Sequence, residues 1–165
     1  MFLVAAIMKI KFRAKDEDTG YWQFGYYVFH QKVTPCVGTT YDKDNDEHML
    51  LFDGFSDWSL PRPWYKCNIN SDTLGQFTNI LDIDKNEIYV GDILKDKLDR
   101  CWIIFCAPGG FCVCNIEEWI KTKGNPIVYS GLSELQNASW TTQNCKIIGN
   151  RYDNPELLTG GNNED

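Results

Sequence analysis

Two segments of this chain constrain its fold most strongly, because each alternates short apolar runs with residues that favour tight turns. Residues 75–95 read GQFTNILDIDKNEIYVGDILK, and residues 145–158 read CKIIGNRYDNPELL. Apolar runs of this length, bounded by Gly, Asp and Asn, are typical of short paired strands. The strands predicted here cover residues 74–81, 87–90, 93–95 and 145–148. Neither segment specifies a catalytic group.

The rest of the chain adds further strands and a helix-capping motif. Residues 9–14 read KIKFRA, so the basic side chains share one face of a strand, and Ile10, Phe12 and Ala14 share the other. Gly25, inside the predicted strand 21–31, indicates a bulge or a close approach of another backbone. Asn154 is expected to cap a short helix that begins at Pro155. The remaining predicted elements are a strand at 33–40, an acidic loop at 42–48, an apolar run at 49–52, turns at 82–86 and 91–92, a hairpin at 101–106 and 111–116, and a helical turn at 117–122.

These patterns predict a mainly β protein with minor α-helix. Aromatic residues make up 14% of the 165 residues and hydrophobic residues 43%, which suffices for a core and favours sheet over helix. Residues 71–165 alternate short strands with Gly-containing turns, a pattern typical of a small SH3-like barrel. Residues 1–70 are predicted to form an N-terminal β element that packs on this barrel, so that the chain makes one compact unit.

Charge is distributed unevenly, and it bears on the choice of partner. The formal net charge is −7, of which residues 1–70 contribute −1 and residues 71–165 contribute −6. An acidic surface repels phosphate backbones and anionic lipids, so neither nucleic acid nor a membrane is expected as the partner. This distribution still permits a small local basic site.

The cysteines and the N-terminus predict a cytoplasmic protein. The opening residues MFLVAAIM lack a basic region, and the eight residues before Lys9 are too few for a secretion signal or a membrane span. An odd number of cysteines, seven, fits free thiols in a reducing compartment. Met8 is an alternative start, because the strand pattern begins at Lys9. Residues 1–7 are then either untranslated or a short extra strand.

Five of the cysteines lie close together in sequence and raise the question of a zinc site. They are Cys101, Cys106, Cys112, Cys114 and Cys145. Their spacing lacks the C-x2-C pair that zinc sites typically use. In the predicted hairpin Phe105 lies opposite Cys112 and Ile103 opposite Cys114, so both thiols share an apolar face and Cys106 points away. Thiols in such places are typical small core side chains, so we predict no metal and no cofactor.

An acidic stretch resembles a calcium loop in spacing alone. Asp42, Asp44, Asp46 and Asp53 occupy positions 1, 3, 5 and 12 of an EF-hand loop. Glu47 stands at the sixth position, where Gly is needed for the sharp turn, and no amphipathic helices flank the loop. A solvated acidic loop is the better interpretation. The spacing of Asp82, Asp84 and Asn86 fails more clearly, since Ile93 stands at position 12.

Motifs for catalysis are missing from the sequence. The chain contains no G-x-S-x-G elbow, no phosphate-binding GK[ST] loop and no G-x-G-x-x-G motif. Its two histidines, His30 and His48, are the only candidates for a His-based site. A Cys–His nucleophile pair stays open, because such partners meet in space rather than in sequence.

Residues 56–66, SDWSLPRPWYK, are the most plausible binding element. Two prolines argue against regular sheet, so this stretch is expected to be an extended loop. Its candidate interaction residues are Trp58, Arg62, Trp64 and Tyr65. Trp and Arg are frequent interface hot spots, and a Pro-rich stretch is already extended. The alternative is that both indoles cover the core, which the usual burial of large aromatic side chains favours.

Three blocks of the chain resemble the YopX family, small proteins encoded by phages and prophages. They are residues 10–14 (IKFRA) followed by Gly20, Trp22 and Gly25, residues 75–78 (GQFT) with 87–93 (EIYVGDI), and residues 147–158 (IIGNRYDNPELL). The resemblance implies a mostly β protein of a mobile element in a bacterial host cytoplasm, without a known activity or a transferable functional residue. Family members often have Gly in the turn before the GluIle pair. Lys85 stands there in this chain, so the turn either avoids a positive φ or strains the lysine.

These observations favour a non-catalytic accessory protein that binds a host or phage protein, copies of itself included. A different class of function is a nucleic-acid-related factor. Such a factor would either mimic DNA through the acidic residues 71–165 or bind single strands through the aromatic side chains of a small barrel. A small enzyme that uses His30 or His48 is the third hypothesis.

Overall fold

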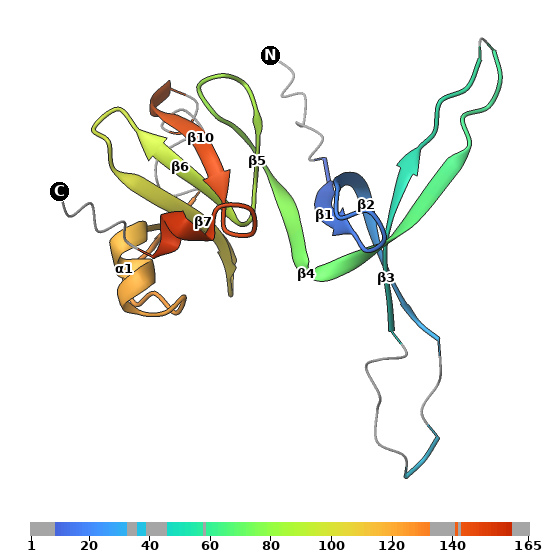
Figure 1. Cartoon of the computed structure of the whole chain (residues 1–165), viewed down its shortest axis with the longest axis horizontal. Coiled ribbons are helices and arrows are strands. Elements are labelled where there is room, and N and C mark those ends of the chain that lie inside the picture. Colours follow the sequence, from blue (N-terminus) through green and yellow to red (C-terminus); the bar gives the residue numbers. More distant parts are fainter. Residues whose placement is uncertain are drawn as a thin grey trace, which may run out of the picture. The chain divides into compact units, whose positions relative to one another are not determined.

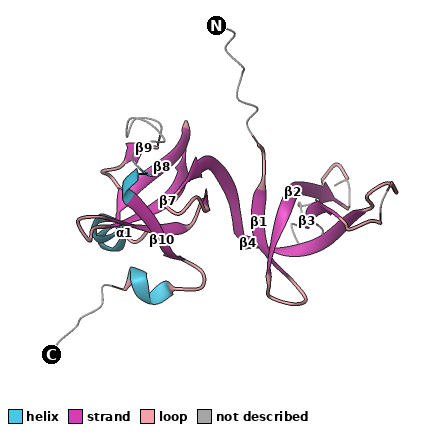
Figure 2. Ribbon diagram, turned by 90° about the horizontal axis from the view of Figure 1, so that it is seen from above, coloured by secondary structure: helices cyan, strands magenta, loops and turns pink. Residues whose placement is uncertain are grey.

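Strands dominate the structure, a computed structural model whose described helices are short (Figure 2). The residues that it describes are 9–32, 36–38, 46–57, 59–132, 141 and 143–159. The mainly β fold predicted from the sequence is confirmed. No helix in the described ranges has the length and the apolar run that are needed to span a bilayer.

The chain forms two compact units. One is Ile10–Gln76, and the other comprises the described residues from Phe77 onward together with Lys9. We call them the N-terminal unit and the C-terminal unit. Strand β4 (Trp64–Leu81) begins in the first and ends in the second. The predicted boundary at residues 70 and 71 lies within β4. The predicted division at that boundary, and the packing of one part on the other, stay predictions.

Four strands of the N-terminal unit, labelled in Figure 1, pair in a closed ring. They are β1 (Phe12–Asp16), β2 (Trp22–Gln31), β3 (Asp46–Asp53) and the first part of β4. β1 pairs with β2, β2 with β3 and β3 with β4, all antiparallel, and β4 returns to pair with β1. A closed ring therefore occurs in the half of the chain for which the sequence predicted only a β element.

The irregular course of β4 lets it reach both of its partners. Its register against β1 shifts between Arg13, which lies opposite Gly75, and Lys15, which lies opposite Asn70. The Thr73 hydroxyl bridges the irregularity, because it accepts from the Lys15 N–H at 2.8 Å and donates to the Asn70 carbonyl at 2.7 Å. Extra residues of this kind bend a strand and increase its twist, which helps so few strands to close.

Apolar side chains fill the inside of the ring. Ala14, Leu50 and Ile69 are buried at its centre. The side chains packed against them are Phe12, Tyr27, Cys67 and Leu74. The alternation predicted for residues 9–14 is confirmed at Phe12 and Ala14, whereas Ile10 lies before β1 and is exposed.

Gly25 lies where β2 and β3 approach too closely for a side chain. A Cβ atom at Gly25 would collide with the carbonyl oxygen of Leu51. The close approach predicted from this strand-interior glycine is therefore confirmed. Leu51 belongs to β3 and lies opposite Tyr26, so the absence of a Cβ at Gly25 permits the β2–β3 pairing.

The C-terminal unit is built on an antiparallel sheet of strand order β10-β6-β7-β8-β9. Its strands are β6 (Asp92–Asp96), β7 (Cys101–Ala107), β8 (Gly110–Asn115), β9 (Ser130–Gly131) and β10 (Cys145–Asn150). A further strand, β5 (Glu87–Tyr89), pairs with the end of β4. β9 and β10 end the sheet in the described pairings, so the SH3-like barrel stays a prediction.

Both faces of this sheet are covered by apolar side chains. One face carries the buried cluster Ile88, Leu94, Ile104, Val113, Leu132 and Cys145. The other carries Ile93, Ile103, Phe105, Cys112 and Cys114. Helix α1 (Ile116–Lys121) and the 3-10 helix η2 (Pro155–Leu158) pack against the second cluster. Phe105 lies opposite Cys112 and Ile103 opposite Cys114, which confirms the predicted hairpin register.

The predicted turns around β5 are present. Gly91 has φ 94°, and the Asp92 carboxylate accepts the Tyr89 N–H at 2.7 Å. In the turn at 82–86, Lys85 has φ 68°. The turn therefore does not avoid a positive φ, and the lysine adopts the strained left-handed backbone.

Other predicted elements differ from the structure. Most of the predicted strand 33–40 lies outside the described residues, and its described part, 36–38, contains a turn. The predicted acidic loop 42–48 is wrong for Asp46–His48, which begin β3. Trp64 and Tyr65 were predicted in an extended loop, but they are the first residues of β4. Cross-strand pairing with β3 overrides the local Pro signal, since both prolines precede the strand.

The Asn154 capping prediction is wrong in its detail. The short helix begins at Pro155 as predicted and is the 3-10 helix η2, but the Asn154 side chain makes no capping hydrogen bond to it. Its Oδ1 atom instead accepts the Asn150 N–H at 3.3 Å, and its Nδ2 donates to Glu156 at 3.1 Å. The side chain therefore closes the turn that precedes the helix.

Candidate binding surfaces of the N-terminal unit

A loop with large exposed side chains joins β3 to β4. The Gly54 N–H donates to the Pro63 carbonyl at 2.8 Å and closes the loop. Within it, the Ser56 hydroxyl donates to the Leu60 carbonyl at 3.0 Å. Phe55 is 87% exposed, and Leu60 is exposed as well. These hydrogen bonds give the loop a defined shape while its apolar side chains face solvent. We call the loop residues 54–63, together with Trp64 and Tyr65 at the start of β4, the β3–β4 loop.

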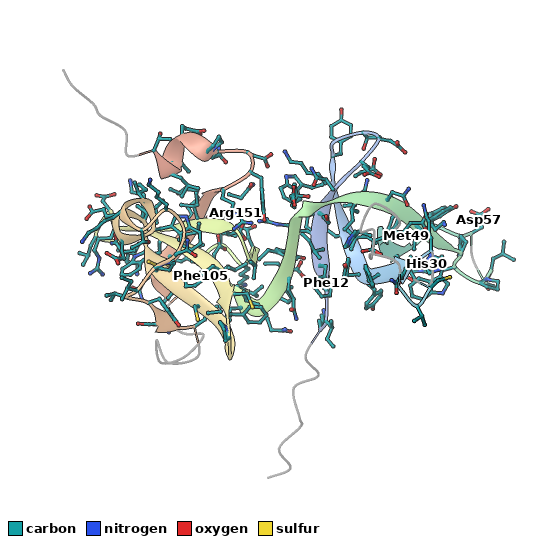
Figure 3. All side chains as sticks on the ribbon, turned by 90° about the horizontal axis from the view of Figure 1, so that it is seen from below. Phe12, His30, Met49, Asp57, Phe105 and Arg151 are labelled. Carbon is teal, nitrogen blue, oxygen red and sulfur yellow. The ribbon has the colours of Figure 1, made fainter. Side chains whose placement is uncertain are left out.

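The structure describes three of the four predicted interaction residues. Arg62 is exposed in the β3–β4 loop, and Trp58 lies outside the described residues. Figure 3 shows Asp57 at the far end of the hairpin that carries this loop, away from Phe12 in β1.

Trp64 and Tyr65 are both exposed, but they do not share a face. As successive residues of a strand they point to opposite sides of β4. The Trp64 ring lies 6.0 Å from that of Tyr26, and the Tyr65 ring lies 6.2 Å from that of Phe52. Trp64 is 63% exposed, so the alternative that its indole covers the core is wrong.

A second surface lies on the outer side of β1 and β2, where cations cover aromatic rings. Because Ala14 faces the core, Arg13 and Lys15 face outward, opposite Phe24 and Trp22. The Arg13 guanidinium lies 4.7 Å from the Trp22 ring centroid, and the Lys15 ammonium lies 5.6 Å from it. The Lys11 ammonium lies 5.4 Å from the Phe24 ring centroid. We call Lys11, Arg13, Lys15, Trp22, Phe24 and Tyr26 the cation–aromatic face.

Sequence reasoning found the basic stripe of this face but missed its pairing with rings. A signal was present, because basic residues alternate through 9–15 and aromatic residues alternate at Trp22, Phe24 and Tyr26. Two alternating stripes in consecutive strands meet on one face when the strands form a hairpin. The register that brings them together depends on the turn at 17–20.

The two histidines are bonded to different groups. His30 Nδ1 lies 3.1 Å from the Glu47 carboxylate in an exposed cross-strand pair, and Lys32 also binds Glu47, at 2.8 Å. Hydrogen bonds from Lys32 first and His30 second lower the pKa of Glu47. His48 Nδ1 and the Tyr27 hydroxyl share a hydrogen bond of 2.7 Å. Burial, followed by the charge of Asp46, raises the pKa of that phenol.

His48 also borders a surface cavity of about 460 Å³. Its other lining residues are Lys15, Asp16, Glu17, Gly20, Ile69, Asn70 and Ser71. The Asp16 carboxylate accepts from the Thr19 N–H and hydroxyl, which lowers its pKa. Burial and the negative charge of Asp16 raise the pKa of Cys67, so this thiol stays protonated rather than becoming a nucleophile.

The hairpin cysteines behave as core side chains. Cys112 and Cys114 are buried with Ile103 and Phe105, and Cys106 is exposed on the other side of β7, as predicted. Burial and the charge of Glu118 raise the pKa of Cys114. Within the described ranges, no three His, Cys, Asp or Glu side chains are grouped as metal ligands.

Acidic side chains of the C-terminal unit are partly internal. Asp82, Asp92 and Asp96 are buried. Asp96 accepts hydrogen bonds from the Arg100 guanidinium at 2.8 Å and from the Trp102 indole at 3.1 Å. These carboxylates therefore add little to the exposed negative surface on which a DNA mimic would depend. Of the predicted calcium-loop residues, Asp42 and Asp44 lie outside the described residues, and Asp46 and Asp53 begin and end β3.

Comparison with known proteins identifies the family. The model of the YopX protein family matches residues 11–159, which is most of the chain. A search of curated proteins found no match. The matched span includes β1 through η2, and with it the three blocks whose resemblance the sequence suggested, except for Ile10. The chain therefore belongs to the YopX family.

Proposed function

We propose that this protein is a non-catalytic accessory protein of a phage or prophage, which acts in the host cytoplasm by binding protein, copies of itself included. The observation that carries the proposal is the exposure of Phe55 and Trp64 around the β3–β4 loop. Single exposed apolar residues are ordinary, but several together on one structured hairpin are typical of interaction sites.

The chemistry of this loop supports a protein partner. Trp, Tyr and Arg dominate interface hot spots, and Trp64, Tyr65 and Arg62 lie within four consecutive residues. Pro61 and Pro63 restrict the backbone on both sides of Arg62, so little conformational entropy is lost on binding.

The polar groups elsewhere in the N-terminal unit support a role in binding rather than in catalysis. His48 Nδ1 shares a hydrogen bond with the Tyr27 hydroxyl, and the exposed His30 shares one with the Glu47 carboxylate. The raised pKa of Cys67 keeps that thiol protonated. An activated nucleophile requires the opposite arrangement, with a lowered pKa or an adjacent base.

The test measures molar mass by light scattering over a range of protein concentrations, together with affinity capture from host cells that carry the phage or prophage. We expect either a mass above that of the monomer or a specifically captured protein. The double variant Phe55→Ser, Trp64→Ser should abolish both.

A matched control is the double variant Ile127→Ser, Val128→Ser, which changes two equally exposed apolar residues of the C-terminal unit. It should behave as the unchanged protein does. A monomer that captures no protein would contradict the proposal, and so would equal losses in the two double variants.

A further inference from the structure

The cation–aromatic face has a regular geometry. Trp22, Phe24 and Tyr26 follow one another at every second position of β2, so their rings lie in a row on one side of the strand. Side chains two positions apart in a strand are about 6.8 Å from each other. Phe24 and Tyr26 are about half exposed, at 45% and 54%. The row therefore presents ring surfaces at even intervals.

Positive charge lines the same row. Lys11, Arg13 and Lys15 extend over the first two rings. Lys66 lies opposite Leu51, which lies opposite Tyr26, so this exposed lysine adds a fourth cation on the same side. β2 itself contains no acidic residue.

Of the described acidic side chains near this face, Asp16 points to the other side of β1, whereas Glu47 and Asp53 of β3 share the outer side with Tyr26. Asp16 ends β1, and its carboxylate accepts from the Asp18 and Thr19 N–H groups within the following turn. Asp53 lies opposite Trp64 near the far end of β3, and the Glu47 carboxylate is bound by Lys32 at 2.8 Å. The net charge of −7 thus coexists with a local positive strip, since the charged side chains that β1 directs to this side, Arg13 and Lys15, are both basic.

Alternating cations and exposed rings are the chemistry that binds unpaired nucleotides. Cations track the phosphates, and bases stack on aromatic rings whatever their sequence. A duplex buries its bases and cannot use the rings, and an acidic peptide needs only the cations. We propose that the cation–aromatic face binds single-stranded nucleic acid without sequence preference. Trp64 of the β3–β4 loop contacts this face at Tyr26. The cations Lys11, Arg13 and Lys15 lie instead over Trp22 and Phe24, so their removal tests this proposal separately from the first.

The experiment measures fluorescence anisotropy of labelled single-stranded DNA and RNA of mixed sequence at several salt concentrations. The triple variant Lys11→Gln, Arg13→Gln, Lys15→Gln should bind more weakly. It should also lower the magnitude of the slope of log affinity against log salt by about 2, because each phosphate contact contributes about 0.7. The variant Phe24→Leu, Tyr26→Leu keeps apolar bulk but removes the rings, and it should lose about tenfold or more in affinity.

The matched control is Lys97→Gln, Lys121→Gln, Lys123→Gln, which removes the same charge from exposed positions of the C-terminal unit and should change little. Thermal unfolding followed by circular dichroism verifies that each variant is folded. Absence of binding by the unchanged protein overturns the proposal. The proposal is also overturned if the triple cation variant loses no more affinity than the control, or if the Phe24→Leu, Tyr26→Leu variant binds as the unchanged protein does. Equal displacement of the probe by duplex DNA or by polyglutamate overturns it as well.

Discussion

The carboxylate of Asp82 accepts a hydrogen bond from the backbone N–H of Ile147, 65 residues further along the chain, at 3.2 Å. The same carboxylate accepts the N–H groups of Asp84 and Asn86 and the Asn86 side chain. One buried side chain therefore shapes the turn after β4 and ties it to β10. Both segments belong to the C-terminal unit. Ile147 begins one of the blocks in which the chain resembles its family, and the turn lies between the two parts of another.

The substitution Asp82→Asn should lower the free energy of unfolding by about 1–3 kcal/mol, because it removes a charged acceptor from buried N–H donors. Urea unfolding provides the measurement. Asp84→Asn is the control, since it breaks only the exposed ion pair with Lys146, and such pairs contribute about 0–1 kcal/mol. Equal losses in the two variants would contradict the role assigned to Asp82.

Acid should destabilise the protein through the same carboxyl group. Burial alone would raise the pKa of Asp82, but hydrogen bonds from Asn86, Ile147 and Asp84 outweigh it and hold the pKa below the usual 3.8. The stabilisation is therefore complete above the unfolded-state pKa and is lost as the pH falls through the lower folded-state value. Urea midpoints measured below about pH 4 should fall more steeply for the unchanged protein than for Asp82→Asn. Parallel curves would refute this account.

Gly25→Ala should destabilise the N-terminal unit by about 2–3 kcal/mol, because the added Cβ collides with the Leu51 carbonyl oxygen and the strands must shift. Amide hydrogen exchange should show the loss of protection in β2 and β3. Gln23→Ala on the same strand is the control and should retain protection. If Gly25→Ala leaves exchange in these strands unchanged, the close approach is absent in solution.

Lys85→Gly should stabilise the protein by about 1 kcal/mol. The left-handed backbone of Lys85, with φ 68°, is unfavourable by about 1–2 kcal/mol for a residue with a Cβ, which exceeds the entropic penalty of glycine. The same change at Lys121, in helix α1, should instead destabilise by up to about 1 kcal/mol. A melting temperature that falls for both variants would show that position 85 carries no strain.

Cysteine reactivity should separate the surface thiols from the core. Burial, and then the charge of Asp96, raises the pKa of Cys145 to about 12, so this thiol stays protonated near pH 8.5. Iodoacetamide labelling followed by peptide mass spectrometry should modify the exposed Cys36 and Cys106 and spare Cys145 until the protein is unfolded. Rapid labelling of Cys145 in the folded protein would show that β10 opens.

Local patterns predicted the elements whose partners lie nearby in sequence. The register of the 101–115 hairpin, with Phe105 opposite Cys112, follows from two apolar runs on either side of a Gly-rich turn. The inward position of Ala14 follows from strand alternation. The first part of β4 was missed, because the alternating residues 65–70 (YKCNIN) directly follow two prolines and lead into the polar run 70–73 (NSDT).

The candidate site was predicted only in part, because some of its geometry depends on strand pairing that no local sequence pattern reveals. Residue types located the exposed cluster around Arg62 and Trp64, since Trp, Arg and Pro together are uncommon outside binding loops or core edges. The start of β4 at Trp64 then sends Trp64 and Tyr65 to opposite faces, and no local signal marks that start. The rings of the cation–aromatic face were overlooked because their cations come from another strand.

The order of residues alone determined that this chain folds as sheet, where its hairpins turn, and to which family it belongs, because these properties depend on side-chain periodicity and short motifs. Only the tertiary structure decided that β1 and β4 meet, with Phe12 opposite Gln76, and thereby close the N-terminal ring. Pairing between strands so distant in sequence is selected by the packing of Ala14, Leu50 and Ile69 in a shared core, an interaction that no local window contains.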